Sequence, residues 1–394
     1  MTVNSDGSLV SYPTINVGGT CTKKTMPIVF MLVVVFLLSM WDVYVPQLGL
    51  RVLDFVGVGL LCFWILWKLA VDMRGPAFRT RNIQLLALMI AWSLVLSVVG
   101  FMGSMENIKP IAGILMGVVV FGYFYSIRLD DRSVVKVLSI LIVIHASYLI
   151  IQYLYYQVFG IVLNIYAFLG TEPRALSSIF RPTGLFLEPA SYSVSMLMLL
   201  SLRMFITMRF DVISYLAMGT IFLTLSVWGL IAVIIFLVVF MRKNAAFLVA
   251  VAVAAVLIAF YTTEIDWTEV LGDTWISERL MNIGEDSSAT TRYGALVGYG
   301  TNTIAPTELW FGKGINNEYH DFGSSGLAFL LSAGGLVGAV FFLLLLLALT
   351  PQGRRFVALT LILLFMTAAP MWTMAYWWFC LALMTRSLER RVAD

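Results

Sequence analysis

The chain has 394 residues, of which 60% are apolar and only 12% are charged. About 25% of the residues in an ordinary soluble domain are charged, so this composition excludes a soluble globular protein. The net charge of +3 gives no basic excess for nucleic acid, and the sequence contains neither a glycine-rich phosphate loop nor zinc-type Cys and His spacing.

The two ends of the chain are predicted to be cytoplasmic tails. Residues 1–26 are polar and rich in Ser, Thr and Gly, which is typical of a disordered segment. The apolar run after Lys23 and Lys24 continues into Trp41 without a small-x-small cleavage site, so we expect an uncleaved first membrane span. Residues 386–394 form the second tail. The three cysteines are far apart in sequence and predict no disulfide framework.

Apolar runs long enough to cross a membrane recur along the chain. A hydrocarbon core about 30 Å thick requires roughly 20 apolar residues in a helix. Eight candidate spans lie at about 27–46, 52–71, 83–103, 108–127, 134–156, 189–208, 245–261 and 324–349.

Two further apolar runs, 212–241 and 356–385, are each about 30 residues long. Basic residues flank both runs, namely Arg203, Arg209, Arg242 and Lys243 for the first and Arg354, Arg355, Arg386, Arg390 and Arg391 for the second. Because Lys and Arg near span ends stay cytoplasmic, each run must cross an even number of times. We therefore predict a short helical hairpin in each run, with Pro370 as the break in the second.

These runs together predict an all-α, polytopic helix bundle of about 12 transmembrane helices. The bundle is a single domain, 27–385, with both termini in the cytoplasm and two larger outer loops, at about 160–188 and 262–323. This topology places most of the 25 Lys and Arg residues on the cytoplasmic side.

The outer loops carry the candidate functional residues, because irregular backbone outside the membrane is where sites concentrate. The first loop contains Arg181 and Glu188 and leads directly into a span at Pro189, which suits the first turn of a helix. The second loop is strongly acidic, contains Arg279 and Arg292, and has His320 just before the next span.

A structural role is the alternative for each of these residues. Outer arginines can pair with acids or lipid head groups, Glu188 can stabilise a helix N-terminus, and His320 can be an ordinary hydrogen-bonding side chain. Within the spans, His145 is expected to be a polar group in helix packing. The cluster Trp372, Tyr376, Trp377 and Trp378 predicts an aromatic belt at the membrane interface.

The order of these elements resembles the Wzy-type O-antigen polymerases and their relatives, the O-antigen ligases. The segment Arg181-Pro-Thr-Gly-Leu-Phe-Leu-Glu-Pro-Ala-Ser resembles the polymerase signature R-x-x-G-x-F-x-E-P-S, with Ala190 displacing the usual Ser by one position. The ligases tend toward Asn-Pro-Asn there.

Three further segments fit the same superfamily, and the resemblance covers about residues 80–350. Leu225 to Gly229 occupies the position of its S-x-x-G hairpin turn, without the second Ser or Arg often found there. Ser288 to Arg292, followed by Trp310 to Gly314, is similar to its R-x-x-x…(L/F)-x-G-x-G stretch. His320 precedes Gly334-Gly335, as the family's His precedes a glycine-rich helix.

The resemblance implies a GT-C-like, metal-independent glycosyltransferase of the bacterial inner membrane, without a cofactor. Donor and acceptor would be undecaprenyl-diphosphate-linked oligosaccharides, and a chain-length-regulating membrane protein is an implied partner. Arg181 and Arg292, with Arg279 as a third candidate, would hold the donor diphosphate, because guanidinium groups bind phosphate bidentately. Glu188 or His320 would accept the proton of the attacking hydroxyl.

Two other functions compete with a polymerase. An O-antigen ligase would transfer the same donor to a lipid A core sugar, and the Glu188-Pro189 pair favours the polymerase over this reading. A transporter of lipid-linked glycans usually shows two related halves and ionisable residues at mid-membrane. This sequence shows no convincing internal repeat, and its charged residues cluster outside the spans.

Overall fold

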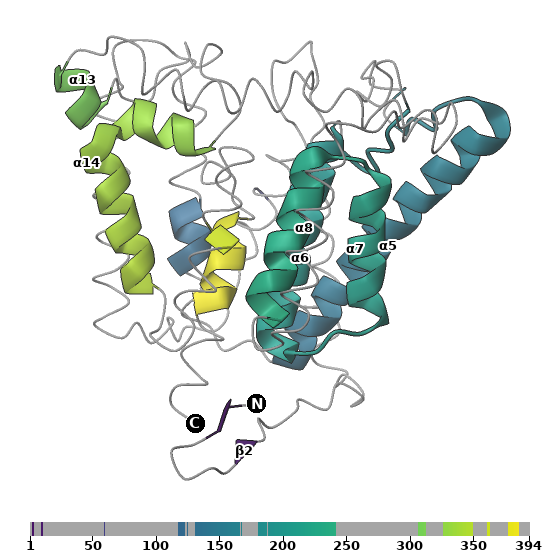
Figure 1. Cartoon of the computed structure of the whole chain (residues 1–394), viewed down its shortest axis with the longest axis horizontal. Helices are drawn as coiled ribbons and strands as arrows, with labels where there is room; N and C mark the ends of the chain where they lie inside the picture. Colours follow the sequence, from purple (N-terminus) through teal and green to yellow (C-terminus); the bar gives the residue numbers. More distant parts are fainter. Residues whose placement is uncertain are drawn as a thin grey trace, which may run out of the picture.

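The structure is a computed structural model of the whole chain, in which helices dominate the described part (Figure 1). It describes residues 2–3, 9–10, 59, 117–122, 124, 131–165, 167, 180–186, 188–241, 306–312, 326–349, 361–362 and 377–385. Strands β1 (Thr2–Val3) and β2 (Leu9–Val10) pair antiparallel within the predicted N-terminal tail. The other residues of that tail lie outside the described part.

Four consecutive helices pack against one another in the middle of the chain. They are α5 (Asp131–Phe159), α6 (Pro189–Thr207), α7 (Val212–Leu223) and α8 (Val227–Met241). The first two confirm the helices predicted at 134–156 and 189–208, and both are long and apolar enough to cross a membrane. Successive helices alternate in direction, so α5 and α6 run in opposite senses (Figure 1).

The apolar run 212–241 divides into two helices, as predicted. Leu225 has a left-handed backbone (φ 49°) in the turn, and the Ser226 hydroxyl accepts a hydrogen bond from the Gly229 N–H at 3.2 Å. That bond caps the N-terminus of α8. With 12 and 15 residues, α7 and α8 are about 18 and 22 Å long, shorter than the hydrocarbon core. The number of crossings in this run stays a prediction.

An ion pair between the buried Arg203 and the partly exposed Asp211 joins α5, α6 and α7 at the end opposite to this turn. The Arg203 guanidinium donates to both carboxylate oxygens of Asp211 and, through Nε, to the Ser139 hydroxyl at 3.0 Å. Asp211 is also the N-cap of α7, accepting from the Ser214 N–H at 3.1 Å. One arginine thus ties the α6–α7 connection to α5.

Helix α14 (Gly326–Leu349) coincides with the span predicted at 324–349 but is broken inside it. Gly335 has φ 59° and ψ −163°, a backbone conformation open almost only to glycine. Its backbone passes against Gly312, the residue that follows α13 (Pro306–Phe311), and a Cβ on Gly335 would lie 2.5 Å from the Trp310 carbonyl carbon and oxygen. The sequence predicts one uninterrupted span here. The structure shows a bent helix, because both glycines are needed for the two backbones to touch.

The prediction of an interfacial aromatic belt is wrong for Trp377 and Trp378. Both side chains are buried, Trp377 stacked on Phe342 and Trp378 packed edge-on against Phe121. These tryptophans belong to the protein core and do not face lipid. Trp372 and Tyr376 lie outside the described residues.

The remaining predictions on topology fall largely outside the described part. This holds for the spans at 27–46, 52–71, 83–103 and 245–261, and for most of 108–127 and 356–385. Of the described helices, α5, α6 and the part of α14 from Leu330 to Leu347 are long and apolar enough to span a membrane. These helices support a helical membrane protein, and the count of about 12 spans stays a prediction.

Candidate functional site

The described part of the predicted site is the segment 181–188, which leads into α6. Arg181 and Glu188 stand at its two ends, and both side chains are half-buried. Arg279, Arg292 and His320 lie outside the described residues, so their placement beside this segment stays a prediction. Leu187, within the segment, is also outside the described part.

Glu188 is the N-cap residue of α6, and Pro189 opens the first turn as predicted. The Glu188 backbone is extended, and its carbonyl accepts a hydrogen bond from the Tyr192 N–H at 3.2 Å. Its carboxylate makes no capping hydrogen bond to the helix. The carboxylate nevertheless stands at the positive end of the helix dipole, where a negative charge stabilises a helix N-terminus.

One face of α5 holds the segment in place. His145, Leu149, Gln152 and Tyr156 follow each other at helical spacing, so their side chains share that face. Tyr156 stacks on Phe180 with ring centroids 3.8 Å apart, and His145 stacks on Phe186 at 5.3 Å. The segment therefore runs antiparallel to α5, along a stretch of helix about 16 Å long.

Gln152 makes the hydrogen bonds between α5 and the segment. Its Oε1 accepts from the backbone N–H groups of Thr183 and Gly184, both at 2.9 Å. Its Nε2 donates to the Leu163 carbonyl at 3.1 Å, on the chain that leaves α5. The side chain is only 1% exposed. Gln152 thus joins the chain that follows α5 and the chain that precedes α6 to one position on α5.

Gly184 is required where the segment meets α6. Its φ is +60°, and a Cβ there would lie 2.8 Å from the Tyr192 ring. Tyr192 is fully buried and also packs edge-on against Phe186. The glycine of the R-x-x-G motif therefore has two steric reasons to be glycine, its left-handed backbone and the ring beside it.

His145 is buried and packs as predicted, although against Phe186 of the segment. Both of its ring nitrogens, the Thr183 hydroxyl and the Tyr192 hydroxyl are buried without a hydrogen-bond partner among the described residues. Sequence analysis missed Gln152. The signal was present, because a Gln seven residues after a His on an apolar helix places two polar groups on one face.

The turn between α7 and α8 docks beside the same end of α6. The Ser193 hydroxyl donates to the Pro189 carbonyl at 2.9 Å and lies 3.0 Å from the Thr224 hydroxyl. A Cβ on Gly229 would lie 2.6 Å from the Ser193 Oγ, so glycine lets α8 approach α6 closely. The structure thereby brings the segment before Pro189 and the S-x-x-G turn, two separate motifs, to one end of the bundle.

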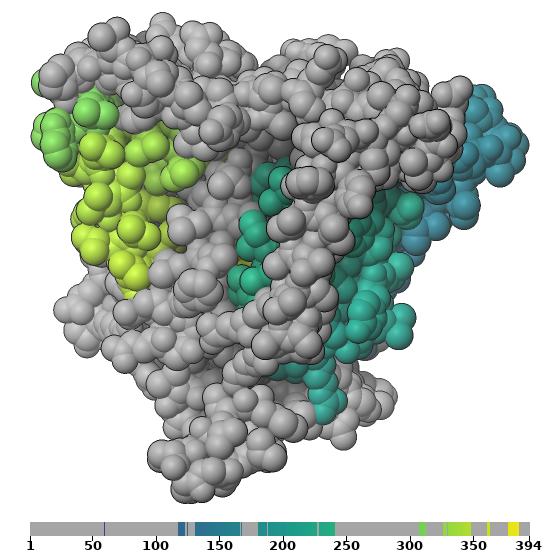
Figure 2. All heavy atoms as spheres, in the orientation of Figure 1, coloured from purple at the N-terminus to yellow at the C-terminus, as the bar shows by residue number. Residues whose placement is uncertain are grey.

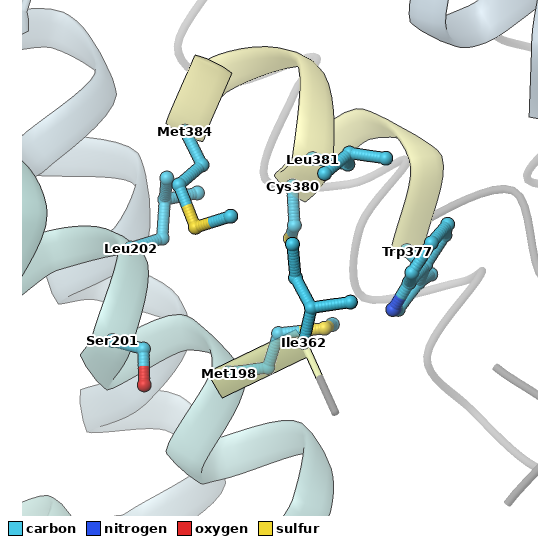
Figure 3. Close-up of a pocket in the computed structure, with 8 residues that line it drawn as sticks. All are labelled: Met198, Ser201, Leu202, Ile362, Trp377, Cys380, Leu381 and Met384. Carbon is cyan, nitrogen blue, oxygen red and sulfur yellow. The ribbon is translucent and has the colours of Figure 1, made fainter. Parts of the chain in front are cut away.

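A cavity lies between α6 and the helical residues 377–385 (Figure 3), and no residue of the segment 181–188 is among its described lining residues. Its described lining includes Met198, Leu202, Cys380 and Met384 and is mainly apolar, with Ser201 and Trp377 as the residues that carry a hydroxyl and an indole N–H. None of its described lining residues is charged, so these residues offer nothing to a diphosphate. Within the described residues, no group of three His, Cys, Asp or Glu side chains could hold a metal ion.

Two comparisons with known proteins found no match. No protein-family model matches the chain. No curated protein sequence matches it either. We therefore infer the function from the chemistry of the candidate residues and from the geometry of the segment 181–188.

Proposed function

We propose that the chain polymerises polyprenyl-diphosphate-linked oligosaccharide repeat units on the periplasmic face of the bacterial inner membrane. The growing glycan is transferred from its lipid diphosphate to the non-reducing end of an incoming lipid-linked repeat. One observation carries the proposal. A segment with an arginine at one end and a carboxylate at the other is fastened to α5 at the head of a membrane-spanning helix.

The chemistry of such a transfer suits these residue types. A hydroxyl of the acceptor sugar attacks the anomeric carbon of the donor, and the bond from that carbon to the diphosphate oxygen breaks. Negative charge grows on the leaving diphosphate, and Arg181, with Arg292 and Arg279, neutralises it through charge-assisted hydrogen bonds. Glu188 or His320 takes the proton of the attacking hydroxyl. No metal is required for either task.

The neighbourhood of the segment supports a membrane-bound substrate. Glu188 lies at the start of α6, a helix that is long and apolar enough to cross the bilayer. The S-x-x-G turn packs against the same helix end through Ser193. A lipid-linked donor would present its diphosphate at this depth, with its prenyl chain in the bilayer and its glycan in water.

Incubation of the purified protein with a synthetic polyprenyl-diphosphate-linked repeat unit tests the proposal. We expect a ladder of repeat multiples on a gel, and a loss of rate of about 100-fold or more in Arg181→Ala and in Arg292→Ala. Arg209→Ala is the matched control, because Arg209 is exposed at the opposite end of α6. That variant should give the ladder of the unchanged protein.

Other outcomes would overturn the proposal. Transfer that occurs only after lipid A core is added would identify a ligase. Absence of transfer to either acceptor, together with movement of the lipid-linked glycan across liposomes, would identify a transporter. A normal ladder from Arg181→Ala would remove that arginine from the mechanism.

A further inference from the structure

We infer that Gln152 is a positioning residue, which sets the backbone of the segment 181–188 and thereby places Arg181 and Glu188. The consequence for activity rests on the proposed function. The role of Gln152 in holding the segment against α5 is independent of that function.

The need for such a residue follows from the surroundings of the segment. Phe180 and Phe186 pack along α5, a helix whose sequence is that of a membrane span. Thr183 and Gly184 are both buried, so their N–H groups are shielded from water, and a buried N–H without a hydrogen-bond partner is destabilising. Oε1 of Gln152 satisfies two consecutive N–H groups, those of Thr183 and Gly184.

The amide of Gln152 is itself held in one orientation. Its Nε2 donates to the Leu163 carbonyl at 3.1 Å, and the Tyr148 hydroxyl donates to the same carbonyl at 3.3 Å. A flipped amide would turn its NH₂ group toward two N–H donors and its oxygen toward a carbonyl. The side chain therefore works as a two-ended clamp between the chain after α5 and the chain before α6.

The clamp acts close to both functional side chains. Thr183 is two residues after Arg181, and Gly184 is four residues before Glu188. A misplacement of a reacting group by about 1 Å can reduce a rate 100-fold. Release of the two N–H groups would let the segment move at its centre and shift both of its ends.

Gln152→Met tests this role, since methionine has a similar length and cannot make these hydrogen bonds. We expect faster hydrogen exchange at the Thr183 and Gly184 amides, measured by mass spectrometry of the full-length protein in detergent. We also expect at least a tenfold fall in kcat on the synthetic repeat unit. Ile151→Met is the matched control, because Ile151 is the neighbouring residue on α5 and is exposed. It should change neither measurement.

Gln152→Glu supplies the rescue and a second variant if Gln152→Met does not fold. It keeps the acceptor oxygen for both N–H groups but loses the Nε2 donor to the Leu163 carbonyl, so we expect exchange at both amides, and activity, to lie between those of the unaltered protein and Gln152→Met.

Three results separate the possible failures. Unchanged exchange in Gln152→Met would overturn the inference. Faster exchange with an unchanged rate would leave a structural clamp and remove the positioning role. If the unaltered protein forms no polymer, the proposed function fails, and the exchange data still decide whether Gln152 holds the segment.

Discussion

Glu188 and His320 are the two residues that can accept the proton of the attacking hydroxyl in the proposed reaction. Loss of a general base lowers a rate by about 10²- to 10⁴-fold. We therefore expect a fall of that size in one of the two variants Glu188→Gln and His320→Ala, and a smaller fall in the other. Initial rates of polymer formation from the synthetic repeat unit distinguish them.

Thermal unfolding is the control for Glu188→Gln. Glutamine matches glutamate in size and removes only the charge, so a melting temperature close to that of the unaltered protein would show that a fall in rate is not caused by unfolding. Nearly unchanged rates in both variants would show that neither residue is the base.

Asp211 provides a test of stability against pH at the junction of α5, α6 and α7. Burial raises the pKa of this carboxyl, but hydrogen bonds from Arg203 and Ser214 and the Arg203 charge outweigh it, so the pKa lies below 3.8. A lowered pKa stabilises the folded state above the unfolded value, and this stabilisation is lost as the pH falls through the folded value. We expect the melting temperature of the protein to fall below about pH 4.

Asp211→Asn is the control for this dependence. It should be less stable at neutral pH, because the buried Arg203 loses its charged partner, and its melting temperature should depend less on pH in this range. The Asp211 side chain is 43% exposed, so water screens the pair and we expect a loss of about 1–2 kcal/mol. An equally steep pH profile in both proteins would contradict the assignment to Asp211.

At the residue scale, the sequence could propose candidate functional side chains in the segment but not the residues that hold the segment in place. Arg181 and Glu188 stand in a polar, Pro-bearing stretch before a span, which is a local pattern. The bonds from Gln152 reach residues 31 and 32 positions away, so only the path of the chain reveals them. Likewise, charge placement put Arg203 near the cytoplasm without showing that Asp211 neutralises it.

Close packing of α8 on α6 depends on the absence of a side chain at Gly229. We expect Gly229→Ala to destabilise the protein by about 1–3 kcal/mol, because the new Cβ would overlap the Ser193 side chain. Gly219→Ala on α7 is the matched control, since no atom lies within 4 Å of the position of its Cβ. Alanine should raise helix stability there by about 0.5–1 kcal/mol.

Denaturation followed by tryptophan fluorescence in detergent compares the two variants. We expect the free energy of unfolding to fall in Gly229→Ala and to rise in Gly219→Ala. Equal effects of Gly229→Ala and Gly219→Ala would show that the α6–α8 contact does not need glycine.

At the element scale, local signals predicted the helices well and their irregularities poorly. The lengths of the apolar runs, the basic residues that flank them and Pro189 predicted α5, α6 and the division between α7 and α8. The break in α14 depends on Gly312, which lies 23 residues before Gly335 and meets it only in the folded chain. The burial of Trp377 and Trp378 could not be predicted from local sequence for the same reason, because their contacts with Phe342 and Phe121 form only in the folded chain.

At the scale of the whole molecule, a second face of α5 is exposed and apolar. Val143, Ile151, Leu154 and Val158 are exposed, and their spacing gives one stripe along the helix. This stripe is distinct from the face that carries Gln152 and His145. The C-terminal end of α5 projects at the edge of the molecule in Figure 2. An exposed apolar stripe of this length suits contact with lipid, as expected for a membrane span.

The orientation of the bundle in the membrane decides whether the segment 181–188 can meet a lipid-linked repeat on the periplasmic face. Phe159 ends α5 near the segment, and Arg209 follows α6 at the opposite end. Both side chains are exposed. In a variant without the three native cysteines, we expect an impermeant maleimide applied from outside to label Phe159→Cys directly, and Arg209→Cys only after the membrane is permeabilised.

Reporter fusions at Asn244 and at the C-terminus should report the cytoplasm in the same topology, because Arg242 and Lys243 follow α8 and basic residues follow the last predicted span. The two methods test different steps of the argument. Labelling of Arg209→Cys from outside, with Phe159→Cys protected, would invert the bundle and place Arg181 and Glu188 in the cytoplasm, where the proposed periplasmic transfer could not occur. An outside reporter at Asn244, with the cysteine pattern as expected, would instead show that α7 and α8 cross an odd number of times.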